Sequence, residues 1–370
     1  MSYSPKFSIT NTILKFIGRI EAARDFIENA PLVPAYEAKF RQEAIIRTVH
    51  HGTHIEGNQL DTGEVAAVLE GQRIDAKDRD IQEILNYRNV LRYIDKYNGE
   101  KNSRGVNLTH TGGGISRHIR FTEKDLLGIH KLTLEKILTD DKVGRFRSTQ
   151  VVVKNSKTRE VSFRPPPAAQ IKILVNEFFS WLNSATAEDV HPVLKAGIVH
   201  YILAFIHPFV DGNGRTARAF ATLVLFSEGY DIKKFFSLEE YFDRDAKRYY
   251  KTLQAVSNQK VGELSDRNLT SWLEYFCEGL TEELERVKKR VQKLSLDSKL
   301  KGRTGQIALS ERQMKLVEYI EANGSVNNQT WRRLLAEFSD DTILRDLKDL
   351  QKKGLIKKKG STKGAIYLLK

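Results

Sequence analysis

This chain of 370 residues has very little cysteine and no long hydrophobic run. Cys277 is its only cysteine, which excludes a disulfide framework and a metal site built from cysteine ligands. None of its apolar runs is long enough to cross a bilayer, and residues 1–20 contain neither a long apolar region nor a small-residue cleavage site. These absences predict a cytoplasmic protein that has no membrane partner.

Positive charge is what the chain has in excess, with a net charge of +13. Residues 301–370 contain 15 Lys and Arg against 8 Asp and Glu, so more than half of the excess lies in the last fifth of the chain. The length and a hydrophobic content of 40% predict a globular protein of two or three domains. The basic end predicts a separate domain that meets a polyanion, although a solvated lysine-rich surface would give the same composition.

Helical periodicity dominates the chain, which contains no internal repeat. Helices are predicted at about 38–57, 80–97, 122–138, 168–183, 191–206, 213–228, 244–256 and 269–294. Thr122 is the expected N-cap of the third helix, with Asp125 at the capping-box position. The polar, glycine-rich residues 98–118 predict a connection or a hairpin insertion. Residues 151–153 favour a strand, and the polar residues after them favour the turn of a hairpin.

The last part of the chain has a pattern of its own, which follows a candidate linker at 298–306. Three capped helices are predicted at 310–324, 327–338 and 339–354, and a strand, a glycine-containing turn and a second strand come after them. Three helices followed by a β-hairpin resemble a winged helix-turn-helix.

The stretch HPFVDGNGRTAR, residues 207–218, directly follows the apolar run YILAFI. Pro208 cannot continue a helix, whereas Gly212 and Gly214 allow tight or left-handed backbone, so a new helix is expected to begin near Asn213. The N-terminus of a helix presents consecutive N–H groups and the positive end of its dipole, and both favour an anion. The stretch therefore predicts a phosphate-binding loop.

The side chains of this loop suit the same chemistry. Arg215 and Arg218 lie three positions apart, so both project near the first turn of the new helix, and their forked donors suit phosphate oxygens. Asp211 would hold a divalent cation, which prefers oxygen ligands and would bridge phosphates. His207 is placed to act as a general base, and Phe209 is expected to be a buried wedge. Each residue alone is more often structural, but their combination within twelve residues indicates a functional site.

The stretch resembles the signature of the Fic (filamentation induced by cAMP) family, HPFx[DE]GNGRxxR, and matches it at every fixed position. The resemblance extends over about residues 35–280. Members of this family usually transfer AMP from ATP to a hydroxyl group of a target protein, with Mg²⁺ and release of pyrophosphate. The resemblance implies that His207 deprotonates a Ser, Thr or Tyr of the target and that Asp211 holds Mg²⁺ on the phosphates.

The resemblance also assigns the residues that bind the nucleotide. The phosphates would be held by the backbone of the glycine turn and by two guanidinium groups: Gly212, Asn213, Gly214, Arg215 and Arg218.

A segment before the signature, GRFRSTQVVV, resembles the flap of the family, a hairpin that pairs with the backbone of the target. Its nucleotide-facing end would be Val153, Lys154, Asn155 and Ser156, and an ordinary surface hairpin is the alternative. Tyr249, in a segment after the signature, would line the nucleotide pocket or pack in the core.

Residues 53–58, THIEGN, resemble the inhibitory motif of the family, [ST]xxxE[GN]. Glu56 would form a salt bridge with Arg218 and prevent productive placement of ATP. The motif requires Ser or Thr four residues before the glutamate, where this chain has Gly52, and Thr53 comes one residue late. A solvated acid at the end of a helix is the alternative for Glu56.

Together these features predict a mainly α protein: a Fic-type helical bundle with a β-hairpin flap and a small C-terminal winged helix-turn-helix domain. The expected parts are an N-terminal helical region with the inhibitory motif, a Fic core, a linker and the winged helix, at 1–100, 101–290, 291–309 and 310–370. The resemblance further implies a homo-oligomer.

The predicted function is an autoinhibited protein adenylyltransferase that uses ATP and Mg²⁺. The alternatives are removal of AMP, transfer of another phosphate-containing group, and a DNA-binding regulator that senses nucleotide. For a DNA partner, Thr342, Arg345 and Lys348 would reach a major groove from the third tail helix. Acidic residues of that helix weaken this interpretation, and winged helices also dock proteins.

Overall fold

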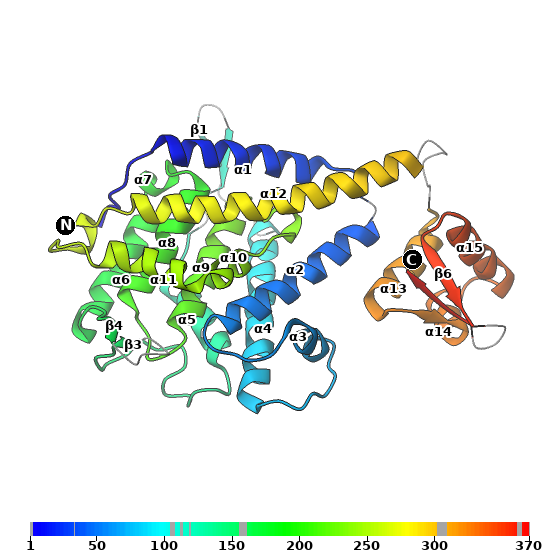
Figure 1. Ribbon diagram of the computed structural model, residues 1–370, viewed down its shortest axis with the longest axis horizontal. Coiled ribbons are helices and arrows are strands. Elements are labelled where there is room, and N and C mark those ends of the chain that lie inside the picture. Colours follow the sequence, from blue (N-terminus) through cyan, green and yellow to red (C-terminus); the bar gives the residue numbers. More distant parts are fainter. Residues whose placement is uncertain are drawn as a thin grey trace. The chain divides into compact units, whose positions relative to one another are not determined.

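The computed structural model describes residues 3–32, 34–103, 108–111, 114–117, 120–154, 161–301, 309–360 and 365–369. Most of these residues are helical and the strands are short, so the predicted mainly α class is confirmed (Figure 1). Contacts divide the chain into two compact units, Met1–Glu28 with Ala44–Val287, and Asn29–Glu43 with Lys288–Lys370. The four-part division expected from the sequence stays a prediction.

The eight helices predicted before the tail are present. The helices of this part are α1 (Asn11–Asn29), α2 (Pro34–His54), α3 (Thr62–Leu69), α4 (Asp78–Ser103), α5 (Glu123–Leu134), α6 (Ile171–Leu182), α7 (Ala185–Glu188), α8 (Pro192–Ile206), α9 (Asn213–Ser227), α10 (Leu238–Arg244), α11 (Ala246–Ser257) and α12 (Thr270–Lys301). Of these, α1, α3, α7 and α10 are additional to the predicted helices. Short 3-10 helices lie at Ala168–Gln170, Ile232–Lys234 and Leu264–Asp266.

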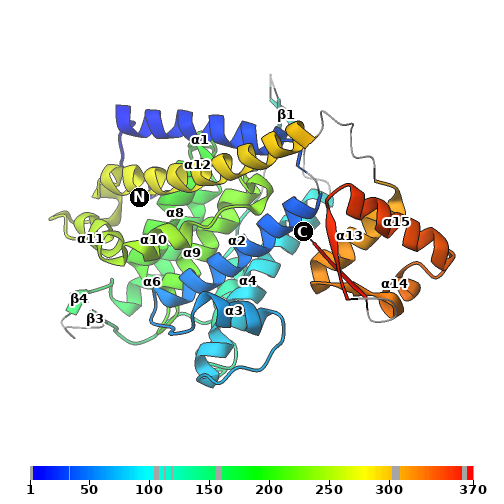
Figure 2. The ribbon, with the colours of Figure 1, turned by 45° about the vertical axis from the view of Figure 1, so that its right-hand side comes forward.

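Helix α8 occupies the core of the first unit, because its apolar residues point in every direction and nearly all are buried. Its neighbour α12 approaches closely at Gly197, where an added Cβ would lie 2.9 Å from a methyl carbon of Leu273. The carbonyl of Gly197 also accepts a 2.7 Å hydrogen bond from the indole of Trp272. Figures 1 and 2 both show α1 alongside α12, and Arg19 and Glu285 join the two helices with an ion pair.

The capping box predicted at the start of α5 is confirmed: Thr122 is its N-cap and the backbone N–H of Thr122 donates to Asp125 at 2.7 Å. The glycine-rich insertion contains the antiparallel strands β1 (Leu108–Thr111) and β2 (Gly114–Arg117), so the hairpin alternative is the one observed. The expected flap is a second antiparallel pair, β3 (Val153–Lys154) and β4 (Val161–Phe163). Strand β3 begins two residues later than the strand predicted at 151–153.

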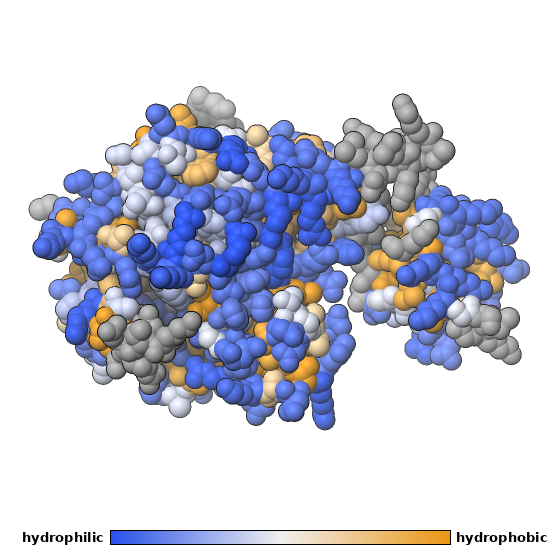
Figure 3. All heavy atoms as spheres, viewed as in Figure 1, coloured by the Kyte–Doolittle hydropathy of each residue, from blue (hydrophilic) through white to orange (hydrophobic). Residues whose placement is uncertain are grey.

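The tail of the second unit contains the three predicted helices, α13 (Glu311–Asn323), α14 (Asn328–Leu334) and α15 (Asp340–Lys352). Strands β6 (Ile356–Lys359) and β7 (Ile366–Leu369) form the predicted hairpin, and the unpredicted strand β5 (Val326–Asn327) extends it to the order β5-β7-β6. Trp331, Leu347 and Tyr367 are among the residues of its buried apolar core. In the view of Figure 3 the surface of the protein is largely hydrophilic, and hydrophobic residues form small separate groups.

Candidate active site

The loop between α8 and α9 has the backbone that its sequence predicts. Helix α8 ends at Ile206, and His207 follows in the left-handed region with φ 52° and ψ 57°. Gly212 is also left-handed, with φ 71°, and an added Cβ would lie 2.9 Å from Leu134, so this position needs glycine. Helix α9 begins at Asn213, and the loop therefore delivers its residues to the N-terminus of a helix.

Two side chains fix the shape of this loop from inside. The amide of Asn213 donates to the carbonyl of Phe209 and accepts from its N–H, both at 2.9 Å. Phe209 is buried as expected, and its ring stacks on the imidazole of His130 with centroids 3.7 Å apart. Asn213 could therefore meet a phosphate only through its backbone, because its side chain is occupied.

His207 has the protonation state that a general base requires. Its Nδ1 lies 3.2 Å from the carbonyl oxygen of Ala204, which can only accept, so Nδ1 carries the proton and Nε2 keeps its lone pair. Burial lowers the pKa of His207 to about 4, and the charge of Arg147 lowers it as well, whereas Glu56 and Asp211 act in the opposite direction. The ring is therefore neutral near pH 7 and Nε2 can take a proton.

Asp211 presents one carboxylate that suits a hard divalent cation. Its side chain is 40% exposed, its Oδ1 accepts the N–H of Gly212 at 2.6 Å, and its Oδ2 lies 3.4 Å from Arg79. The described residues contain no group of three or more His, Cys, Asp or Glu that could hold a metal ion. Mg²⁺ commonly binds one or two carboxylates, substrate phosphates and water, so Asp211 fits this role together with a nucleotide.

The two arginines of the loop face different acids. Arg215 lies 3.1 Å from Glu83 of α4, and Arg218 lies 2.8 Å from Glu56. Burial opposes the charge of Arg218, but Glu56 and the surrounding tyrosines outweigh it and raise the pKa of Arg218. Within the described part of the chain, Nε and Nη1 of Arg218 are buried without a hydrogen-bond partner. The pair with Glu56 uses only Nη2 of Arg218.

Glu56 lies in the turn that ends α2, and its own contacts hold it at the loop. Its N–H donates to the carbonyl of Thr53 at 3.0 Å, and the hydroxyl of Tyr250 donates to the carbonyl of Ile55 at 3.3 Å. An added Cβ at Gly214 would collide with Oε1 of Glu56, so the carboxylate rests directly on the glycine turn.

Gly52, the departure from the inhibitory motif, has a packing reason. An added Cβ would lie 2.6 Å from the ring of Tyr87, whose hydroxyl donates to the buried Glu239 at 3.0 Å. The carbonyl of Gly52 accepts a 2.9 Å hydrogen bond from Arg218. The expected Ser or Thr side chain is thus replaced by the ring of Tyr87, and the backbone at position 52 still binds the arginine.

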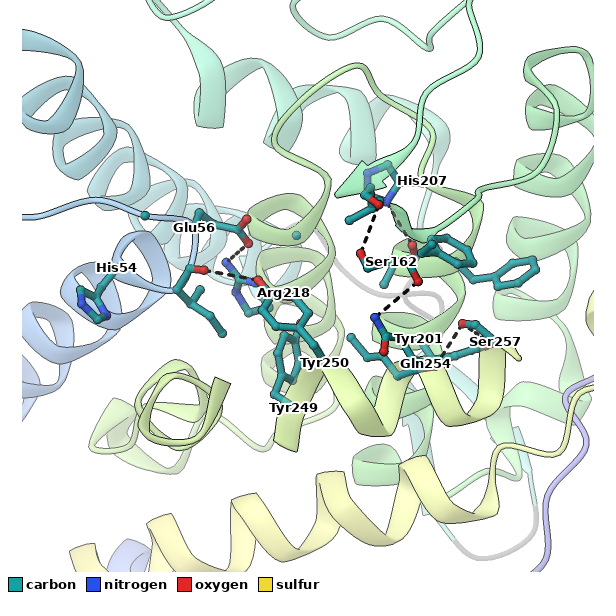
Figure 4. Close-up of a pocket in the computed structure, with 18 residues that line it drawn as sticks. His54, Glu56, Ser162, Tyr201, His207, Arg218, Tyr249, Tyr250, Gln254 and Ser257 are labelled. Atoms are coloured by element: carbon teal, nitrogen blue, oxygen red, sulfur yellow. Dashed lines mark hydrogen bonds and ion pairs between the residues drawn. The ribbon is translucent and has the colours of Figure 1, made fainter. Parts of the chain in front are cut away.

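Figure 4 shows these groups around one pocket of about 480 Å³, with Glu56 and Arg218 pointing toward each other and His207 on another side. The size is within the usual range for a small-molecule site. Its lining residues come from α2, the flap, α8, α9 and α11: His54, Ile55, Glu56, Gly57, Val153, Ser162, Phe163, Tyr201, Ala204, Phe205, His207, Gly214, Arg218, Tyr249, Tyr250, Leu253, Gln254 and Ser257.

Residues 120–225, which include this loop, match the family model described as Fic/DOC family. The chain carries a Fic domain.

The curated relatives include proteins named protein adenylyltransferase Fic. Those of Culex quinquefasciatus and Aedes aegypti are each 32% identical over 216 residues, which cover 57% of this chain and 38% of the relative. This chain thus spans well under half the length of these relatives. A Fic family protein of Desulfovibrio desulfuricans G20 has a similar fold, with a TM-score of 0.63 and 22% identity over 100% of this chain and 98% of that one. A Fic domain protein of Bacteroides thetaiotaomicron gives a TM-score of 0.59 at 21% identity, over 78% of this chain and 97% of that one.

Other residues predicted for the Fic domain lie at different distances from the pocket. Val153 lines it, Lys154 pairs with Val161 in the flap, and Asn155 and Ser156 lie outside the described residues. Tyr249 is buried and lines this pocket, and its hydroxyl lies 2.9 Å from Nε2 of His200, whereas its contact with a nucleotide stays a prediction.

Three residues of the Fic domain site were not predicted from the sequence. His130 accepts the N–H of Gly144 at 2.9 Å and donates to the carbonyl of Asp211 at 3.1 Å, which fixes its Nε2–H tautomer. Burial lowers the pKa of His130 to about 4. Glu83 forms an ion pair with Arg215, and Arg147 donates a hydrogen bond to the carbonyl of His207.

Among the described residues, no helix combines the length and apolar character that crossing a membrane requires.

Proposed function

We propose that this protein transfers AMP from ATP to a Ser, Thr or Tyr hydroxyl group of a target protein. The observation that carries the proposal is that His207, whose Nδ1 faces the carbonyl of Ala204, shares one pocket with Gly214 and Arg218. The names of the curated relatives support the same reaction.

In the proposed reaction, Nε2 of His207 takes the proton of the target hydroxyl group. The hydroxyl oxygen bonds to the α-phosphorus, the bond from that phosphorus to the bridging oxygen breaks, and pyrophosphate leaves. The N-terminus of α9 and the guanidinium groups of Arg215 and Arg218 would stabilise the charge on the phosphates. Mg²⁺ bound by Asp211 would neutralise part of the same charge.

We further propose that Glu56 inhibits this reaction within the same chain. Its carboxylate occupies Arg218 and lies on Gly214, where the last phosphate of ATP would have to be placed. A carboxylate and a phosphate compete for the same guanidinium, and their like charges oppose simultaneous binding. The flap would hold the target backbone by strand addition, and its exposed Val152 and Val161 support this role.

Intact-mass measurement after incubation with Mg-ATP tests the function. The Glu56→Gly variant should gain the mass of AMP more than the wild type does, and the Glu56→Gly, His207→Ala double variant should gain none. A gain of phosphate alone would favour a kinase-like transfer, and no gain would favour a nucleotide sensor. Loss of AMP from a premodified protein, if it required Glu56, would favour the removal reaction.

A second candidate function, DNA binding by the tail, gains support from its ion pairs. Three aspartates of α15 are already paired within the second unit: Asp340 with Arg332 at 2.5 Å, Asp346 with Arg312 at 2.8 Å, and Asp349 with Lys353 at 2.6 Å. Exposed Arg345 and Lys348 of the same helix are then less opposed by negative charge. Thr342 is less available, because its hydroxyl group hydrogen-bonds to Ser339 at 2.9 Å. Binding to duplex DNA at low salt is the direct test.

A further inference from the structure

Arg147 is a buried arginine next to the catalytic loop, and its side chain is bound by three separate stretches of backbone. Its Nε donates to the carbonyl of His207 at 2.9 Å, its Nη1 to Thr149 at 2.9 Å, and its Nη2 to Pro166 at 2.6 Å. Its backbone N–H donates to the carbonyl of Pro208 at 2.9 Å. Only 4% of Arg147 is exposed.

The acceptors have an unusual feature for a buried cation. In the described part of the chain, every hydrogen bond of the Arg147 side chain ends on a backbone carbonyl, and none ends on a carboxylate. Three nitrogen atoms in a planar fork each reach a different carbonyl, which the single ammonium of lysine could not reproduce. The arrangement therefore requires arginine by its shape as well as by its charge.

These carbonyls belong to the two parts of the site that must act together. Thr149 precedes strand β3 and Pro166 follows strand β4, so the guanidinium joins both arms of the flap at their base. The third carbonyl belongs to His207, whose left-handed backbone is unfavourable for a residue other than glycine. A hydrogen bond to this carbonyl helps to hold the backbone in that conformation.

We propose that Arg147 is a positioning residue that fixes the base of the flap to the backbone of His207 and so keeps the imidazole oriented. This inference rests on the proposed function, because the flap and His207 are taken as the target-binding and proton-accepting parts. The charged groups acting on His207 are Arg147, which lowers its pKa, and Glu56 and Asp211, which raise it. Removal of the positive charge should therefore raise the pKa of His207.

Two substitutions separate the charge from the fork. Arg147→Lys keeps the charge and loses the three-way hydrogen bonding, whereas Arg147→Met loses both. Arg267→Met is the matched control, because Nη1 of Arg267 also binds three backbone carbonyls, those of Val256, Ser257 and Gln259. All variants are made in the full chain with Glu56→Gly, and thermal unfolding identifies any that do not fold.

The pKa of His207 is measured from the pH dependence of its carbethoxylation by diethyl pyrocarbonate, read on the peptide by mass spectrometry. Reactivity of the parent should stay nearly constant between about pH 5 and pH 8, because the pKa lies near 4. In Arg147→Met the fall in reactivity at low pH should begin at a higher pH than in the parent, because one charge that lowers the pKa is removed, and in Arg147→Lys it should begin at the same pH as in the parent. An unchanged profile in a folded Arg147→Met protein would overturn the role of the charge.

Hydrogen exchange of residues 149–154 and 161–166 measures the fixation of the flap. Both Arg147 variants should exchange there at least tenfold faster than the parent, and Arg267→Met should not. AMP incorporation should fall at least tenfold in both Arg147 variants. If the parent incorporates no AMP, the proposed function fails, while carbethoxylation and exchange still decide the role of Arg147. Unchanged exchange in Arg147→Lys would overturn the role of the fork.

Discussion

The carboxylate of Glu56 lies 2.8 Å from the guanidinium of Arg218, and the two residues are 162 positions apart in the chain. Arg218 is almost fully buried, whereas the side chain of Glu56 is 29% exposed. The acid is therefore the partner that can leave, and the arginine is the partner that stays. This asymmetry is what a removable inhibitor of a phosphate site requires.

Glu56→Gln should increase the affinity for ATP about tenfold, because a hydrogen bond to a charged group contributes about 1.5–3 kcal/mol and each 1.4 kcal/mol is a factor of ten. Glutamine keeps the shape of the side chain and removes its charge, so it isolates the ion pair. Titration calorimetry with Mg-ATP measures the effect. Glu70→Gln, an exposed acid beyond α3, is the control and should leave the affinity unchanged. Equal affinities of Glu56→Gln and wild type would contradict the proposed inhibition.

Gly52→Ser, which restores the residue type of the inhibitory motif, should destabilise this protein by about 1–3 kcal/mol because the new side chain overpacks against a ring. An added Cβ at position 52 would lie 2.6 Å from Tyr87. Combining it with Tyr87→Leu should cost less than the sum of the two single changes. Urea unfolding measures all four proteins.

Gly18→Ser in helix α1 is the control for this cycle, because a Cβ added at Gly18 would meet nothing within 4 Å. It should leave the free energy of unfolding nearly unchanged. If Gly52→Ser behaved like Gly18→Ser, the packing explanation for Gly52 would be wrong.

Much of the loop between α8 and α9 could be predicted because its determinants are local. A proline after α8, a left-handed glycine at Gly212 and the start of α9 at Asn213 depend on neighbouring residues, and the structure contains all three. The capping box at Thr122 is local in the same way. The Glu56–Arg218 pair is not local, and only the resemblance to a known family connected its two halves.

The residues that were missed have partners without a sequence signature. Arg147 binds backbone carbonyls, which every residue possesses, so no spacing of residue types indicates it. His130 likewise connects a backbone N–H to a backbone carbonyl across different segments. The need for glycine at position 52 comes from the ring of Tyr87, which contacts it only when α4 packs against α2 in the folded protein. The two-residue strand β5 depends in the same way on pairing with β7, which is distant in the sequence.

His200 should make the protein less stable as the pH falls. Its pKa is lowered to about 3 by burial, with a contribution from the charge of Arg218, whereas in the unfolded chain it is about 6.5. Because the unfolded state binds the proton first, the stabilisation is complete above pH 6.5 and decreases by about 1.4 kcal/mol per pH unit below it.

His200→Gln should remove that part of the pH dependence between pH 6.5 and pH 4. Urea unfolding of both proteins at several pH values measures the slope. The variant will be less stable at pH 7.5, since the hydroxyl of Tyr249 loses its imidazole partner. Parallel stability curves for the two proteins would show that His200 is not the group responsible.

If the tail binds DNA, Arg345→Ala and Lys348→Ala should each weaken binding and reduce the slope of log affinity against log salt by about 1. Fluorescence anisotropy with a duplex at several salt concentrations measures both quantities. Lys251→Ala, an exposed residue of α11, removes the same charge from the other unit and should leave the slope unchanged. If binding to DNA did not depend on salt, or if no binding occurred at low salt, DNA binding would be contradicted and docking of a protein by the tail would be favoured.

The bare backbone at Gly214 has a consequence for how the protein would respond to its surroundings. A methyl group added at Gly214 would collide with the carboxylate of Glu56, so this carboxylate and a triphosphate bound at the turn would compete for the same small volume. Because Glu56 belongs to the same chain, its local concentration is fixed, and a higher ATP concentration would displace it from the site. The fraction of active protein would therefore follow the cellular ATP level as a saturation curve. Any partner that stabilised the turn after α2 would shift the midpoint of that curve toward higher ATP without touching the nucleotide.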